Sequence, residues 1–175
     1  MLARTFARLP STNRLAAHAL ALAALTLSSG TAVAIGPVPL TMQTLVVTMA
    51  GVLLGARQGA LLVALWVTLG FSGAPLFAFG NAGPAALLGP TAGYLLSFPL
   101  VAYAAGVLAC RGGLLRIFAA MLAANFFCLI FGSAWLSVTL GVPQAFAAGF
   151  LPFVAGAVLK SVLGTLLIGA MGGRR

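Results

Sequence analysis

The residue whose type and position most strongly suggest chemistry is Lys160, a cation inside a long apolar run near the end of the chain. The run extends about ten residues to either side, or about 15 Å of helix, which is beyond a lysine side chain's reach. At mid-bilayer a cation costs from about 3 to more than about 10 kcal/mol. Proteins usually offset this cost with a carboxylate, but the sequence contains no Asp or Glu.

Four states of Lys160 satisfy this constraint. The amine is neutral, the side chain snorkels to the headgroups, backbone carbonyls solvate it in a wet cavity, or an anion comes from outside the chain. We favour the last state, in which Lys160 meets the carboxylate of a ligand. Gly156 and Gly164 lie one turn away on the same helix face, and these small residues either admit a neighbouring helix or leave space for a ligand.

The residues that other kinds of chemistry require are absent from the sequence. The sequence has no P-loop motif for ATP hydrolysis and no carboxylate for a proton or sodium relay. It also lacks a Ser-His-Asp set and a paired acid and base, so we expect no enzyme, catalytic residue or cofactor. Cys110 and Cys128 are predicted at different membrane depths, which argues against a disulfide, and no metal-ligand spacing is present. A ligand-binding protein of this kind takes its energy from another subunit or only equilibrates its ligand.

The elements that position Lys160 follow from composition. The 175 residues are 62% hydrophobic and only 5% charged, whereas about a quarter of a soluble domain is charged. In lipid the backbone must form helices or a closed barrel, and the apolar runs lack the alternation of barrel strands. The sequence therefore predicts an all-α integral membrane protein. The basic residues are few and scattered, so nucleic acid is not an expected partner.

Six transmembrane helices fit the chain at about 20 residues each, in one membrane domain over 1–175. The apolar runs place them at about 15–35, 41–54, 59–71, 89–109, 115–138 and 148–170. The second and third are short and are joined by a tight turn at 55–58. An alternative interpretation is that the two together form one bent hairpin.

The arginines set the orientation. All eight precede the first span, follow the sixth, or lie between the second and third or the fourth and fifth spans, whereas the other three connections are uncharged. The positive-inside rule then places both termini in the cytoplasm of a multi-pass protein of the cell membrane. The N-terminal run ending in Ala32-Val33-Ala34 also imitates a cleavable signal peptide, but its removal would turn the charge pattern against the rule.

Three further features have two readings each. The uncharged Gly- and Pro-rich loop 72–88 is either a binding loop or a plain connection. Asn125 is more often an interhelical hydrogen bond than a ligand contact. Ala17 and Ala21 on the first helix form a docking face for a partner helix, or only reflect an alanine-rich stretch.

Several motifs, in order along the chain, resemble the BioY family of biotin-uptake proteins. They are PVPLTMQTL at 37–45, AGVLLGAR at 50–57, GAPLFA at 73–78, LGPTAGYL at 88–95 and AGFLPF at 148–153, the last leading to Lys160. The resemblance implies a six-helix S component of an energy-coupling-factor transporter, which binds its vitamin near the external face. It also implies a transmembrane coupling subunit and a pair of ATPases as partners, with Ala17 and Ala21 contacting the coupling subunit.

For the ligand, the resemblance implies biotin, whose carboxylate is the anion that Lys160 requires. The neutral bicyclic head needs hydrogen-bonding groups, and the residues expected to line its site are Asn81, Tyr94, Thr41, Gln43 and Thr91. The family's last helix has an Asp three residues before the Lys, where this chain has Ala157. That departure leaves Lys160 without a counter-ion from the protein. It also keeps open a second function, a membrane interaction or scaffold protein with a degenerate pocket.

Overall fold

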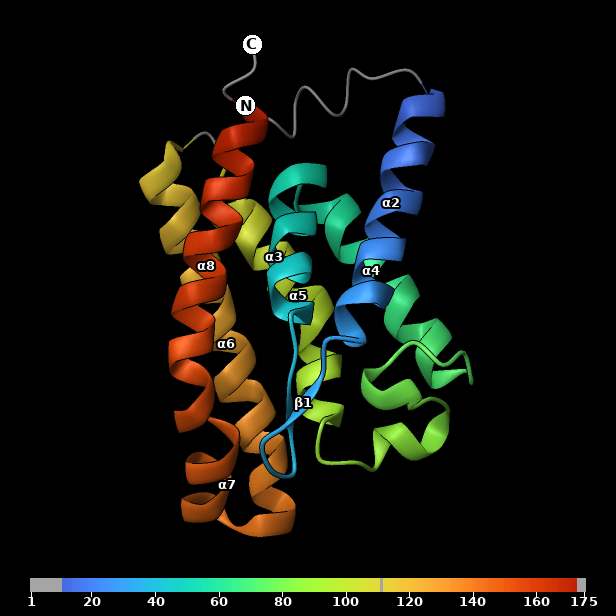
Figure 1. Cartoon of the computed structure of the whole chain (residues 1–175), viewed down its shortest axis with the longest axis vertical. Helices are drawn as coiled ribbons and strands as arrows, with labels where there is room; N and C mark the ends of the chain where they lie inside the picture. Colours follow the sequence, from blue (N-terminus) through green and yellow to red (C-terminus); the bar gives the residue numbers. More distant parts are fainter. Residues whose placement is uncertain (1–10, 111, 173–175) are drawn as a thin grey trace.

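The computed structural model describes residues 11–110 and 112–172, which form a bundle of helices (Figure 1). The α-helices are α2 (Ser11–Ser29), α3 (Gln43–Leu54), α4 (Ala56–Phe71), α5 (Ala92–Leu108), α6 (Leu114–Leu140), α7 (Val142–Gly149) and α8 (Leu151–Gly172). Two short strands, β1 (Val33–Ala34) and β2 (Pro39–Leu40), pair as an antiparallel hairpin. Two 3₁₀ turns, η1 (Ala78–Gly80) and η2 (Pro84–Leu87), lie between α4 and α5. The predicted all-helical architecture is confirmed.

Helix α5 lies at the centre of the bundle and packs against α3, α4 and α6. Its residues Val101, Ala102 and Ala105 are fully buried. Small residues let these helices approach closely, because a Cβ placed on Gly51 of α3 would collide with the carbonyl oxygen of Ala102. Close approach through small residues is typical of helix pairs in membranes.

Both the core and the outer surface of the bundle are apolar. Leu61, Ile130, Val138 and Leu166 are each more than 60% exposed, and such surfaces are rare on soluble monomers. Within the described residues, two helical segments are long and apolar enough to cross a bilayer, Leu114–Leu140 and Val142–Gly172. Three shorter apolar helices, α3, α4 and α5, have 12, 16 and 17 residues.

The first helix ends earlier than the sequence predicts. It stops at Ser29, and the remaining apolar residues to Ile35 belong to a turn and the first strand of the hairpin. The hairpin reverses through Gly36, whose φ of +153° an L side chain rarely adopts. The first predicted span is therefore too long at its C-terminal end. Hydrophobicity does not separate the two segments, because a two-residue strand is as apolar as the end of a helix.

Two junctions also differ from the expected spans. The expected turn at 55–58 is a single residue, Gly55 at φ 89°, so α4 begins at Ala56. The expected loop over 139–147 contains α7, which starts after Gly141 and has a proline in its first turn. A proline there loses no intrahelical hydrogen bond, which is why the segment continues as helix.

The long connection between α4 and α5 is packed against the bundle. The ring of Phe77 meets Trp66 edge-to-face at a centroid distance of 5.4 Å and occupies the space that a side chain on Gly70 would fill. The amide of Gly83 donates to the carbonyl of Gly70 at 2.7 Å. These contacts hold the loop against the C-terminal half of α4.

The helix ends divide between two ends of the bundle. In Figure 1 the start of α2, the α3–α4 junction, the α5–α6 connection and the end of α8 all lie at the top. The α4–α5 connection and α7 lie at the opposite end. Arg14, Arg57 and Arg116 belong to the first group of segments, whereas Arg4, Arg8, Arg111, Arg174 and Arg175 lie outside the described residues.

Candidate ligand-binding site

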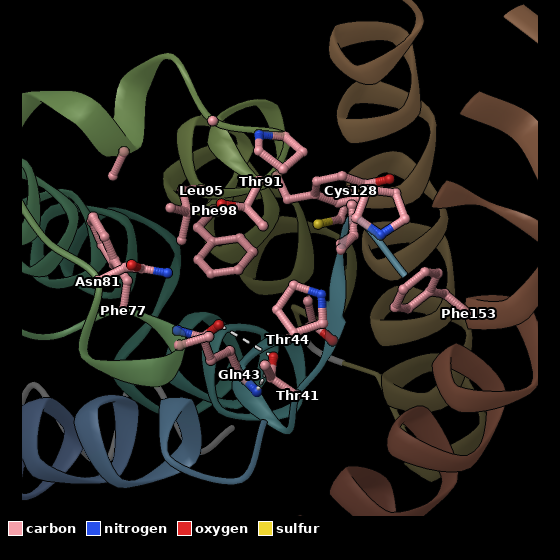
Figure 2. Close-up of a pocket in the computed structure, with 18 of the residues that line it drawn as sticks. Thr41, Gln43, Thr44, Phe77, Asn81, Thr91, Leu95, Phe98, Cys128 and Phe153 are labelled. Carbon is pink, nitrogen blue, oxygen red and sulfur yellow. Dashed lines mark hydrogen bonds between the residues drawn. The ribbon is translucent and has the colours of Figure 1, made fainter. Parts of the chain in front are cut away.

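A pocket of about 400 Å³ lies among the hairpin, the α4–α5 connection and helices α3, α5, α6 and α8 (Figure 2). Its volume is within the usual range for small-molecule sites, about 300 to 1,000 Å³. Most of its wall is apolar and includes Val38, Phe77, Leu95, Phe98, Leu129 and Phe153. A few polar groups interrupt this wall, which is the usual composition of a site for a small, partly apolar ligand.

Lys160 lines this pocket from the middle of α8, as the sequence predicts for its place in the last helix. The side chain is half-buried, and its Nζ donates a hydrogen bond to Oγ1 of Thr44 on α3 at 3.3 Å. A neutral hydroxyl does not balance a positive charge, and the chain contains no carboxylate side chain. No acidic side chain of this sequence is therefore available to Lys160 as a counter-ion.

The wall one turn before Lys160 is apolar. Ala157 is 3% exposed and lines the pocket. Of the two nearby glycines, Gly164 packs against Met121 and Leu45, where a Cβ would collide. Around Gly156 the nearest atom to such a Cβ is Leu40 Cδ1 at 3.4 Å. Gly164 thus serves helix packing, whereas Gly156 leaves room beside the lysine.

Gln43, the first residue of α3, carries a buried donor that has no acceptor. Its side-chain Oε1 accepts from the hydroxyl of Thr41 at 3.2 Å, and its backbone amide donates to the same hydroxyl at 3.3 Å. The residue is only 4% exposed, and its Nε2 has no hydrogen-bond partner among the described residues. Buried amide groups are nearly always paired, so an orphan in a pocket wall indicates a position for a ligand acceptor.

Asn81 and Thr91 come from the connection between α4 and α5. The backbone of Asn81 closes a tight turn with Phe77 and Ala78, through hydrogen bonds of 3.1 and 3.2 Å, which presents its carboxamide to the pocket. Thr91 is the N-cap residue of α5, and its hydroxyl forms no capping bond. Figure 2 shows Asn81 and Gln43 on the same side of the pocket and Thr91 on the far side of Phe98.

Tyr94 lines the pocket, but its hydroxyl is already engaged. It donates to the carbonyl of Gly149 at 2.7 Å and lies 3.3 Å from Oγ of Ser133. The ring is buried. Tyr94 therefore offers the pocket the surface of its ring, rather than the hydroxyl that the sequence suggests as a hydrogen-bonding group.

All six residues expected at a ligand site line this one pocket: Lys160, Asn81, Tyr94, Thr41, Gln43 and Thr91. Their contacts with a ligand stay predictions. Thr44 and Cys128, which also line it, were missed. The signal that could have identified Thr44 is its hydroxyl, which lies next to Gln43 at the start of a predicted helix. Cys128 was expected only as an unpaired thiol at mid-span, and both cysteines are free.

Asn125 forms the interhelical hydrogen bond that the sequence favours, and its contact with a ligand stays a prediction. Its Nδ2 donates to Oγ of Ser161 at 3.1 Å and to the carbonyl of Met121 at 3.0 Å, which joins α6 to α8. The residue also lines the pocket. Ala17 and Ala21 lie far from it in the sequence, on α2, and are partly buried against the protein's own core. Their role in docking a partner stays a prediction.

Comparison with known proteins assigns most of the chain to one family. Residues 3–173 match the model of the BioY family. The biotin transporter BioY2 of Lactococcus lactis is 34% identical over 154 residues, which cover 85% of this chain and 84% of that protein. The biotin transporter BioY of Rhizobium etli is 37% identical over 143 residues, with coverages of 75% and 76%.

A solved structure shares the fold. It is a crystal structure of the S component for biotin from an ECF-type ABC transporter, and it aligns with a TM-score of 0.84 over 95% of this chain and 96% of that one. The two sequences are 23% identical. The predicted resemblance to an S-component bundle is thus confirmed at the level of the fold.

Proposed function

This chain belongs to the BioY family, and we propose that it binds biotin in the pocket described above and mediates uptake of the vitamin across the cell membrane. The observation that carries the proposal is Lys160, a half-buried cation facing a mostly apolar pocket in a chain without acidic residues. Biotin combines a carboxylate with a neutral, partly apolar body. Family membership also agrees with the prediction that the protein is not an enzyme, because the named relatives are transporters.

Each predicted ligand residue has a role within this proposal. Lys160 meets the carboxylate, and Asn81, Thr41 and Thr91 offer hydrogen bonds to polar atoms of the ligand. Tyr94 contributes the surface of its ring. Gln43 supplies the buried amide donor that lacks an acceptor among the described residues. The alanine at position 157 gives the ligand an apolar contact beside the lysine.

The proposed topology has six transmembrane helices and cytoplasmic termini in one membrane domain over 1–175. The spans are α2, α3, α4, α5, α6 and the continuous segment α7–α8. Support comes from the apolar outer surface and from Arg14, Arg57 and Arg116, which belong to segments at one end of the bundle in Figure 1. The hairpin and the α4–α5 connection, which line the pocket, belong to the end without these arginines. In this topology the pocket opens to the outside of the cell.

The proposed partners are a transmembrane coupling subunit and a pair of ATPases. The absence of a P-loop in the sequence means that this chain does not itself hydrolyse ATP by that route. Purification from the host should therefore recover the ATPases with this protein. Recovery of the protein alone, with uptake intact, would show a solitary carrier instead.

The alternative of a scaffold protein with a degenerate pocket is not favoured. A degenerate site would be expected to collapse or fill with side chains, whereas this pocket keeps its volume, a lysine without an acidic partner in the sequence, and a buried amide that has no partner among the described residues. The relatives that cover most of the chain are named as transporters.

Equilibrium binding of labelled biotin to the purified protein tests the proposal. Native protein should bind, and Lys160→Ala should bind at least about tenfold more weakly, because a charged hydrogen bond is worth about 1.5 to 3 kcal/mol. Arg57→Ala removes a cation at the α3–α4 junction, outside the pocket, and should bind as the native protein does. Undetectable binding by the native protein would reject biotin transport, whereas equal binding by Lys160→Ala would reject only the role of the lysine.

A further inference from the structure

One wall of the pocket is held by residues that lie behind it. Phe77 lines the pocket and is only 4% exposed, and its ring packs against two aromatic rings of α4. It meets Trp66 edge-to-face at a centroid distance of 5.4 Å and Phe71 at 5.1 Å. No described residue of α2 or α4 lines the pocket. Phe77 therefore joins the pocket wall to helices that lie outside the pocket.

Phe77 also begins the turn that carries Asn81. Its amide donates to the carbonyl of Asn81 at 3.1 Å, and its carbonyl accepts from the amide of Gly80 at 3.0 Å. Figure 2 shows Phe77 and Asn81 next to each other at one edge of the pocket. The position of the Asn81 carboxamide therefore depends on where the ring of Phe77 is held.

The same turn contains a strained residue. Phe79 has φ 60° and ψ 24°, in the left-handed region that is uncommon for a residue with a bulky side chain. Its side chain is 63% exposed, so burial of the ring does little to offset the strain. Strained residues persist where the surrounding contacts fix the backbone. The buried ring of Phe77 supplies such contacts to this turn.

Trp66 is in turn fixed by α2. The residue is 1% exposed, and its Nε1 donates to Oγ1 of Thr26 at 3.1 Å. An indole nitrogen can only donate, and a buried one needs an acceptor. The hydroxyl of Thr26 serves as that acceptor while it donates to the carbonyl of Leu22 at 3.1 Å. The contacts therefore run from Thr26 through Trp66 to Phe77, and so to the turn at the pocket.

We propose that Thr26 and Trp66 are positioning residues for ligand binding, which act through Phe77 on the turn that carries Asn81. The inference rests on the proposed function and deepens it, because biotin is the ligand whose affinity the two residues raise. It gives α2, a helix without a described residue in the pocket wall, a part in ligand binding. The group that acts is the hydrogen bond between the hydroxyl and the indole, rather than the bulk of either side chain.

Calorimetric titration of biotin into the purified full-length protein tests this proposal, because it measures the dissociation constant and the number of sites separately. Thr26→Val keeps the shape of the side chain but removes the acceptor, and Trp66→Phe removes the donor. Each should raise the dissociation constant about two- to tenfold, the range for one hydrogen bond. A variant that only misfolds would instead lower the number of sites and leave the remaining sites with the native dissociation constant.

Two further variants identify the bond as the cause. Thr26→Ser keeps the hydroxyl and should bind as the native protein does. The double variant of Thr26→Val and Trp66→Phe should bind no more weakly than the weaker single variant. Both substitutions remove the same bond, and the effects of residues in contact do not add.

Thr139→Val is the matched control. Thr139 lies near the end of α6, its hydroxyl donates to the carbonyl of Leu136 at 3.0 Å, and it does not line the pocket. The variant therefore loses a bond to its own helix, as Thr26→Val also does, but no bond to an indole. It should keep the native dissociation constant.

Three results would overturn the proposal while biotin binding stands. Fewer sites with the native dissociation constant in Thr26→Val and Trp66→Phe would show that the two residues only stabilise the fold. Weak binding by Thr26→Ser would show that the hydroxyl is not the group that acts. Effects that add in the double variant would show that the two residues act separately. Native protein that does not bind biotin would reject the proposed function, and this inference with it.

Discussion

The hydroxyl of Tyr94 on α5 donates a 2.7 Å hydrogen bond to the carbonyl of Gly149, the last residue of α7. The ring lies against Gly132 of α6, where a Cβ would collide with it. One side chain thus connects three helices at the point where α7 ends and α8 begins. The same ring forms part of the pocket wall, so the geometry of the wall depends on this bond.

Tyr94→Phe should therefore lower stability more than it lowers biotin affinity. The variant leaves the Gly149 carbonyl without its donor, at a cost of about 1 to 3 kcal/mol. The pocket keeps the ring. Thermal unfolding in detergent and biotin titration measure the two effects. Tyr103→Phe is the control, because Tyr103 is exposed and forms no hydrogen bond within the described residues. Loss of biotin binding with unchanged stability would show that the hydroxyl contacts the ligand.

The contact between α3 and α5 at Gly51 gives a second prediction. A Cβ on Gly51 would meet the backbone carbonyl of Ala102, which cannot move without shifting the helix. Overpacking of this kind costs about 1 to 3 kcal/mol. Gly51→Ala should thus unfold at a lower temperature, whereas Gly113→Ala should not, because no atom lies within 4 Å of a Cβ there. Equal melting temperatures would contradict the close approach of the two helices.

The proposed orientation can be tested with the exposed thiol of Cys110, just beyond the end of α5. A membrane-impermeant maleimide should label it in inverted vesicles and leave it unlabelled in intact cells. Thr139→Cys, near the other end of α6, should show the opposite pattern in a Cys110→Ala background. Cys128 is buried and should contribute little. Labelling of both positions from the same side would rule out the proposed topology.

The helices and Lys160 were predictable because their signals are local in sequence. A cation within an apolar run can be recognised without knowing its neighbours, and the missing acids can be counted. The hairpin was not predictable, because two-residue strands continue the apolar run that precedes them. Helix α7 was missed for the opposite reason, since a glycine and a proline marked a loop where they begin a helix.

The site required the folded chain. The sequence predicts Lys160 and Gln43 as separate site residues, but the hydrogen bond between Lys160 and Thr44 joins residues 116 positions apart. The states of two side chains are visible only in the folded chain. The hydroxyl of Tyr94 donates to the carbonyl of Gly149, and the buried amide of Gln43 lacks an acceptor among the described residues. Neither result can be inferred from residue type or spacing.

A structure of this protein determined with biotin tests the account most directly. We predict biotin density in the pocket, with the carboxylate within hydrogen-bond distance of Lys160 Nζ. Biotin bound with its carboxylate away from Lys160, or at a different place on the protein, would contradict the account.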